Sequence, residues 1–278
     1  MPDSQPVTDI LLATDLGPRC DRALLRAFSL ASQWNARLHL VLVVEPSTRP
    51  TWEDNVIADR AKAEVLEIVA DSPVDWRIII RRGPVDEEVL EVARDTGCQL
   101  IIVGMAINEF LGRARPGRLV EALIRRSPVP ILMVKKARSE QYRRLLALTD
   151  FSAVSEAAIV RAMSLFPGSS LSILHAYRVP FAGFLGEGTA KDVRDAANAE
   201  TLAFVGGLGE KATFESPPTV RLEQGSPEVL LQSLTRSGSV DLTVIGVHPT
   251  WGMHRHSGNL AGRLLMASAT DVLAVPAG

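Results

Sequence analysis

The feature that most constrains this chain is an internal repeat. One copy runs from residue 100 to 134 as LIIVGMAINEFLGRARPGRLVEALIRRSPVPILMV, and the other from 242 to 275 as LTVIGVHPTWGMHRHSGNLAGRLLMASATDVLAV. The opening strands repeat too, as ILLATDL and LLALTDF, which places Asp15 and Asp150 135 positions apart. That spacing is a usual size for one hydrophobic core. We therefore predict two similar domains, at 1–137 and 142–278, joined by the polar stretch 135–141.

Hydrophobic periodicity predicts the elements of the first domain. Buried strands are predicted from their apolar runs at 9–16, 38–44, 76–82, 100–103 and 131–134. Helices are predicted from apolar stripes within 16–36, 52–70, 86–96 and 118–126. The stretch 104–117 is predicted to be a glycine-opened loop. Strands that alternate with such helices form right-handed βαβ units, so each half is predicted to be a doubly wound, five-stranded parallel α/β domain.

A long connection in the second half, residues 178–191, is also predicted to be a loop. Its sequence RVPFAGFLGEGTAK is rich in glycine and contains two phenylalanines. Two interpretations remain open, a lid over a binding site and a loop docked on the surface.

Composition argues against several classes of partner. The formal net charge of −2 gives no bulk attraction to nucleic acid or to an anionic membrane. The sequence has no membrane-length apolar run and no signal peptide at its start, so a cytoplasmic location is expected. Cys20 and Cys98 form no CxxC pattern, which argues against a disulfide framework and a thiolate metal site.

The repeat also predicts where a ligand would bind. In a doubly wound sheet, ligands bind at the carboxyl ends of the strands where the winding direction reverses. Asp15 would then face Gly104 across one crevice, and Asp150 would face Gly246 across another. The carboxylate can accept hydrogen bonds from a base or ribose, while a glycine loop before a helix receives phosphate. Each aspartate could instead cap the helix that follows it.

These residues resemble the universal stress protein family, and in particular its tandem members. The resemblance covers nearly the whole chain and rests on ILLATDL, LVLVVEP, ILHAYRV, RRGPVDEEVLEVA, DTGCQLIIVG and SPVPILMV. It implies a sheet ordered 3-2-1-4-5 in each half, pairing through the last strands so that the halves pack as a pseudo-dimer, and a role in stress resistance. It also implies binding of ATP or another adenine nucleotide, with the backbone of Val43 or Ala176 at the adenine edge.

The family's ATP pattern is Gly, two residues, Gly, nine residues, Gly, then Ser or Thr, and in the first half it is eroded. Gly104 and Gly117 match, but Ile107 replaces the second glycine and Arg118 stands where the hydroxyl belongs. A lost contact to a charged oxygen costs about 1.5–3 kcal/mol, or roughly ten- to hundredfold in affinity. We therefore expect weak or absent ATP binding.

The second half has lost other parts of the same pattern. Gly246 matches, Pro249 replaces the second glycine, and Gly258 arrives one residue early with Asn259 after it. Proline has no N–H to offer a phosphate. Of the two crevices, the sequence favours the first for nucleotide binding, because its spacing and Gly117 survive.

Charged and imidazole side chains crowd both loops. The guanidinium groups at 113, 115 and 118 could replace the lost phosphate contacts, or they are solvated loop charges. In the second loop, His248, His254 and His256 could present imidazoles to zinc, although polar loop residues are the favoured interpretation.

Three functions remain open at this point. The first is a stress-response regulatory or protective module, with the two halves associated and a homodimer or an unidentified protein as partner. The second is an adenine-nucleotide sensor that uses the first crevice. The third is an enzyme acting on a phosphorylated small metabolite, at most a slow ATPase, since no P-loop, Rossmann or nucleophile-elbow motif is present.

Overall fold

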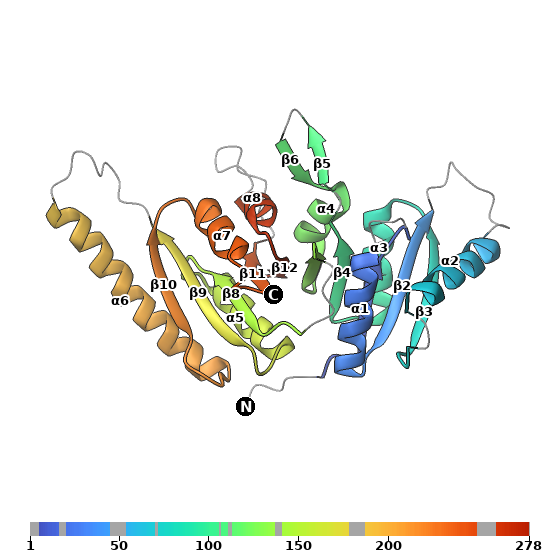
Figure 1. Cartoon of the computed structure of the whole chain (residues 1–278), viewed down its shortest axis with the longest axis horizontal. Coiled ribbons are helices and arrows are strands. Elements are labelled where there is room, and N and C mark those ends of the chain that lie inside the picture. Colours follow the sequence, from blue (N-terminus) through green and yellow to red (C-terminus); the bar gives the residue numbers. More distant parts are fainter. Residues whose placement is uncertain are drawn as a thin grey trace. The chain divides into compact units, whose positions relative to one another are not determined.

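The computed structural model describes residues 6–16, 21–44, 54–69, 72–105, 107–110, 113–136, 141–177, 187–248 and 260–277. The chain divides into two compact units, which comprise essentially residues 5–141 and 142–277. Each is an α/β domain built around a parallel sheet (Figure 1).

The sheet of the first half has the predicted order. Its strands are β1 (Asp9–Ala13), β2 (Arg37–Val44), β3 (Trp76–Arg82), β4 (Leu100–Gly104) and β7 (Ile131–Val134). They are arranged as β3-β2-β1-β4-β7, and all neighbouring pairs are parallel. Because β1 lies between β2 and β4, the carboxyl ends of these three strands meet at one edge, as the sequence predicts.

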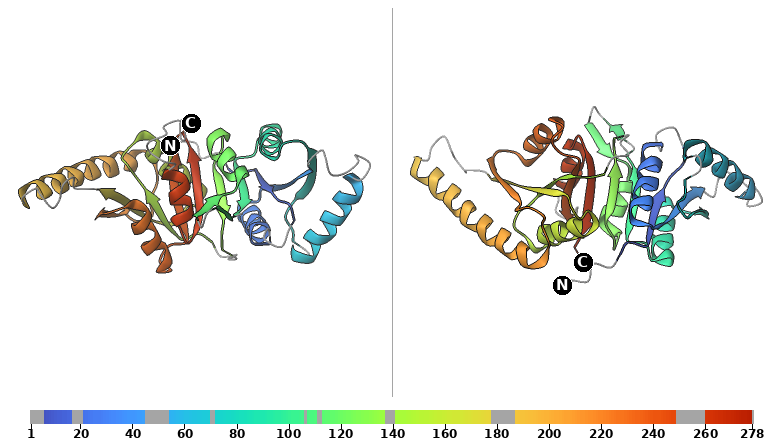
Figure 2. Two further views of the ribbon diagram at one scale, coloured as in Figure 1. Left: turned by 90° about the horizontal axis from the view of Figure 1, so that it is seen from above. Right: turned by 60° about the horizontal axis from the view of Figure 1, so that its bottom comes forward.

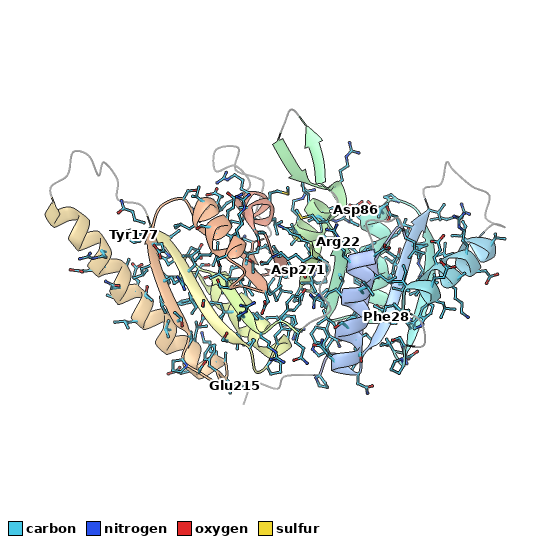
Figure 3. The ribbon with its side chains drawn as sticks, in the orientation of Figure 1. Arg22, Phe28, Asp86, Tyr177, Glu215 and Asp271 are labelled. Atoms are coloured by element: carbon cyan, nitrogen blue, oxygen red, sulfur yellow. The ribbon has the colours of Figure 1, made fainter. Side chains whose placement is uncertain are left out.

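Helices cover both faces of this sheet. They are α1 (Asp21–Trp34), α2 (Asp54–Val69), α3 (Val85–Thr96) and α4 (Arg118–Arg126). The first two lie on one face and the last two on the other (Figure 2, left). Helix α3 ends where Gly97 takes the left-handed conformation (φ 62°), which a glycine adopts without strain. On the other face, Phe28 of α1, which is labelled in Figure 3, lies edge-on to Trp76, and the ring centroids are 5.9 Å apart.

The second half repeats this architecture. Its strands are β8 (Arg144–Leu148), β9 (Ser170–Tyr177), β10 (Thr219–Gln224), β11 (Leu242–Val247) and β12 (Asp271–Pro276). Its helices are α5 (Ala153–Leu165), α6 (Glu187–Lys211), α7 (Pro227–Arg236) and α8 (Leu260–Ala267). The strands are arranged as β10-β9-β8-β11-β12, again all parallel, so the order 3-2-1-4-5 is confirmed in both halves.

Two predicted loops contain regular structure. The stretch 104–117 holds an antiparallel hairpin of β5 (Ile107–Phe110) and β6 (Arg113–Pro116), in which Ile107 pairs with Pro116 and Phe110 with Arg113 (Figure 1). In the connection 178–191, the last five residues already belong to α6. Whether 178–186 forms a lid lies outside the described residues. The packing of the halves as a pseudo-dimer stays a prediction.

A polar network centred on the buried His39 connects the amino ends of the first three strands. His39 is 1% exposed, and its Nε2 lies 2.8 Å from Asp9 Oδ1. Arg77 donates from Nε to Nδ1 of the same ring at 2.8 Å. Since Nδ1 accepts, the neutral ring carries its proton on Nε2 and donates it to Asp9. The network lies at the end of β1 opposite to Asp15.

No helix among the described residues is both long enough and apolar enough to cross a membrane.

Candidate ligand-binding crevices

The turn that follows the first strand has the same geometry in both halves. Thr14 Oγ1 accepts a hydrogen bond from the N–H of Leu16 at 3.0 Å, and Thr149 Oγ1 accepts one from Phe151 at 2.9 Å. Leu16 and Phe151 have positive φ angles of 52° and 61°. Such a conformation costs a bulky residue about 1–2 kcal/mol. This strained turn places the aspartate of each half just beyond its strand end.

Asp150 is not itself the N-cap of α5, and its role in ligand binding stays a prediction. Its Oδ1 accepts a hydrogen bond from the N–H of Ser152 at 3.1 Å, and Ser152 is the N-cap of α5. The same carboxylate lines a pocket. Burial acts to raise the pKa of Asp150, but hydrogen bonds, mainly from Ser152, outweigh it and hold the pKa below its ordinary value. Asp150 is therefore ionised at neutral pH.

The pocket lies in the second half and has a volume of about 280 Å³. It opens at the carboxyl ends of β8, β9 and β11. The side chains that line it are mostly apolar and are completed by a few polar groups: Leu148, Thr149, Asp150, Ser152, Val154, Ser155, Leu174, His175, Ala176, Pro227, Ile245, Gly246, His248, Leu260 and Leu264. An apolar cleft with few polar groups is typical of small-molecule sites, and this one is near the small end of their usual range of about 300–1,000 Å³.

Packing at the wall of this pocket requires a glycine at position 246. A Cβ atom on this residue would lie 2.8 Å from the carbonyl oxygen of Val154, in the first turn of α5. Only a glycine lets β11 and α5 approach so closely. Gly246 therefore has a packing role in addition to the phosphate-binding role that the sequence predicts for it.

Ala176 lies on the pocket wall, and the contact of its backbone with adenine that the resemblance implies stays a prediction. Its neighbour His175 also lines the pocket and was not expected there. His175 donates from Nδ1 to the carbonyl oxygen of Thr149 at 2.9 Å. Its ring stacks on Phe151, with centroids 4.2 Å apart, and Phe151 also contacts Phe204 of α6 at 5.5 Å. The ring of His175 thus fixes the strained turn that holds Asp150. The repeat could not indicate this role, because the first half has Leu42 at this position.

The structure brings several first-half candidates to one edge of their sheet. Asp15 follows β1, Val43 is the penultimate residue of β2, and Gly104 ends β4. Gly117 is the buried N-cap of α4, in extended conformation, and Arg118 is the exposed first residue of that helix. The hairpin β5–β6 separates Gly104 from Gly117. Amide groups that bond across this hairpin are not available to a phosphate.

Of the remaining candidate site residues in the second half, the structure describes one and leaves the others undescribed. His248 lines the second-half pocket. Pro249, Gly258, Asn259, His254 and His256 lie outside the described residues. Within the part of the chain that the structure describes, no cluster of three or more His, Cys, Asp or Glu side chains could hold a metal ion.

Comparison with known proteins agrees with this geometry. The model of the universal stress protein family matches the chain twice, at residues 6–135 and 141–276. The chain belongs to the universal stress protein family. Each match covers one of the two α/β domains, so this is a tandem universal stress protein.

Individual relatives agree with the assignment. A universal stress protein of Methanocaldococcus jannaschii is 26% identical over 144 residues, which is 47% of this chain and 84% of the relative. A universal stress protein structure from Archaeoglobus fulgidus DSM 4304 is similar at 17% identity, over 97% of this chain and 98% of that chain, with a TM-score of 0.74. A functionally unknown protein from Pseudomonas aeruginosa PAO1 is similar at 20% identity, over 98% and 94%, with a TM-score of 0.71. At these identities the two structures support the fold alone.

Proposed function

We propose that this tandem universal stress protein is a stress-response regulatory module that senses an adenine compound, binding it in the second-half pocket and binding ATP only weakly. The observation that carries the proposal is the pocket of about 280 Å³ at the carboxyl ends of β8, β9 and β11. Adenine compounds are the ligand class that the family resemblance implies.

The shape and chemistry of the pocket support a flat heteroaromatic ligand. Leu174, Ile245 and Leu264 provide apolar walls, and Ala176 is small enough to leave room beside the backbone of β9. Asp150 is exposed and lines the pocket, and its carboxylate can accept hydrogen bonds from a sugar hydroxyl.

The same geometry favours the second half over the first. From spacing alone, the first half kept more of the phosphate-binding pattern. Its residues 107–110 and 113–116 nevertheless form paired strands, so a loop that wraps around a phosphate would require the hairpin to open. The use of the first crevice stays a prediction, and the experiment below separates the two.

Filling each crevice in turn tests the proposal. Ala176→Phe places a ring in the second-half pocket, and Val43→Phe does the same at the matched position of β2 in the first half. Isothermal titration with adenosine and with ATP should give binding to the unchanged chain and to Val43→Phe, and a loss of at least about tenfold in Ala176→Phe. Circular dichroism and thermal melting establish that both variants fold. If Val43→Phe alone loses the ligand, the first crevice is the site, and if the unchanged chain binds neither compound, the sensing function is wrong.

A further inference from the structure

Three aromatic rings connect helix α6 to the second-half pocket, although none of the described residues of α6 lines that pocket. Phe204 of α6 lies against Phe151, with ring centroids 5.5 Å apart and ring planes tilted by 60°. Phe151 in turn stacks on His175 of the pocket wall, with centroids 4.2 Å apart and planes within 22°. The inference drawn from this three-ring stack rests on the proposed function of the pocket.

The middle ring of the stack belongs to the strained turn after β8. Phe151 has a φ angle of 61°, which a bulky residue adopts only where its surroundings hold it there. One contact that holds it is local, the hydrogen bond from its N–H to Thr149 Oγ1 at 2.9 Å. The others are the rings of His175 and Phe204. Because Asp150 directly precedes Phe151, the position of its carboxylate depends on all of these contacts.

The first half has the same turn without the stack. Leu16 has a φ angle of 52° there, and Leu42 takes the position that matches His175. The hydrogen bond to the threonine hydroxyl is present in both halves, so the turn itself does not require aromatic rings. The stack is thus an addition in the second half, where it attaches the turn to one particular helix.

Helix α6 is intrinsically weak directly after Phe204. Gly206, Gly207 and Gly209 follow within five residues, and glycine destabilises a helix interior relative to alanine. Packing does not require two of these glycines, since a Cβ atom at 206 or 209 would meet nothing within 4 Å. The fully buried side chain of Leu208 holds the segment closed. Local opening of this segment is easier than opening of the core, and it withdraws Phe204 from the turn.

We propose that Phe204 is a positioning residue of the second-half pocket, and that the order of α6 sets how tightly the pocket binds its ligand. With α6 closed, the three-ring stack fixes the turn and holds the Asp150 carboxylate in place for a hydroxyl group of the ligand. With the segment 205–211 open, the turn loses the contact with Phe204 and the pocket loses affinity. Because such coupling is reciprocal, a bound ligand stabilises α6 in turn.

Amide hydrogen exchange in the ligand-free full chain tests the contact first, with NMR following the N–H of Phe151. Phe204→Leu keeps apolar bulk but removes the ring, and it should speed this exchange by about fivefold or more. Phe204→Tyr keeps the ring and should leave the exchange within about twofold of the unchanged chain. The control is Ile159→Val in α5, which removes one fully buried methyl group and lowers stability without removing a ring. An equal increase in Ile159→Val, or none in Phe204→Leu, would overturn the positioning role.

Isothermal titration with adenosine tests the effect on the pocket in the same variants. Phe204→Leu should weaken binding by about fivefold or more, while Phe204→Tyr and Ile159→Val should keep it. Adenosine should also slow amide exchange in the segment 205–211 of the unchanged chain. Unchanged affinity in Phe204→Leu would overturn the coupling and leave the proposed function standing. Absence of adenosine binding to the unchanged chain would remove the proposed function and, with it, the control of affinity, while the exchange data still decide whether Phe204 positions the turn.

Discussion

The close contact between Gly246 and Val154 illustrates how one position can serve packing and binding together. A Cβ atom at 246 would meet the carbonyl oxygen of Val154 at 2.8 Å, and backbone cannot move aside as a side chain can. The glycine is easily read from the sequence as part of a phosphate cradle. Its packing role depends on how β11 approaches α5, which no local pattern encodes.

Two glycine substitutions of opposite effect follow from this contact. Gly246→Ala should lower the free energy of unfolding of the second half by about 1–3 kcal/mol, because the new methyl group overpacks the α5–β11 contact. Gly206→Ala in α6 should raise it by about 0.5–1 kcal/mol, since nothing lies within 4 Å of the added Cβ and alanine favours the helix. Urea denaturation followed by circular dichroism measures both. Equal effects of the two changes would contradict the packing role.

His39 makes the stability of the first half depend on pH. Burial is the main cause that holds the pKa of His39 below its ordinary value of about 6.5, and the hydrogen bond to Asp9 offsets it only in part. In the unfolded chain the ring binds its proton at higher pH than in the folded chain. Stability is therefore fully present above about pH 6.5 and is lost as pH falls toward the folded-state pKa.

Replacing this ring should flatten the pH dependence of stability. His39→Gln should show a smaller loss in the free energy of unfolding of the first half between about pH 7 and pH 5 than the unchanged chain. Tryptophan fluorescence reports mainly on that half, because three of the four tryptophans, Trp34, Trp52 and Trp76, lie in it. An identical slope in both proteins would show that His39 does not contribute to it.

Among the elements, those with strong periodicity or clear boundaries were predicted closely. The helix at 118–126 and the strand at 76–82 have the predicted bounds, because each carries an apolar pattern that ends at a turn residue. The hairpin β5–β6 was missed, since short mixed strands such as INEF and RARP have no hydrophobic face of their own. The start of α6 was missed because the glycines in GEGTAK are typical of loops.

The first turn of α5 contributes to the stability of the second half and forms part of the pocket wall. Ser152→Ala removes the hydroxyl that accepts from the N–H of Ser155, and it should lower the free energy of unfolding by about 0.5–2 kcal/mol. Ser152→Asp should recover most of this loss, since aspartate is an equally good N-cap. Chemical denaturation compares the three proteins. A loss of similar size in both variants would show that packing, and not capping, is the role of Ser152.

For the whole molecule, the duplicated architecture was predictable, and the proposed difference between its two crevices was only partly so. The repeat of ILLATDL and LLALTDF predicted two domains, and the same strained turn is present after both strands. The eroded glycine pattern predicts that neither half keeps an intact phosphate cradle, and this stays a prediction. The sequence could not indicate the shape of the second-half pocket, because that shape depends on side chains such as His175 and Phe151 that meet only in the folded chain.

The number of ligands per chain tests this divergence most directly. Native mass spectrometry of the full chain, titrated with adenosine, counts the bound molecules. We predict one adenosine per chain, which is lost in Ala176→Phe and kept in Val43→Phe. Two adenosines bound in succession with similar affinity would show that both crevices still work and would contradict the account.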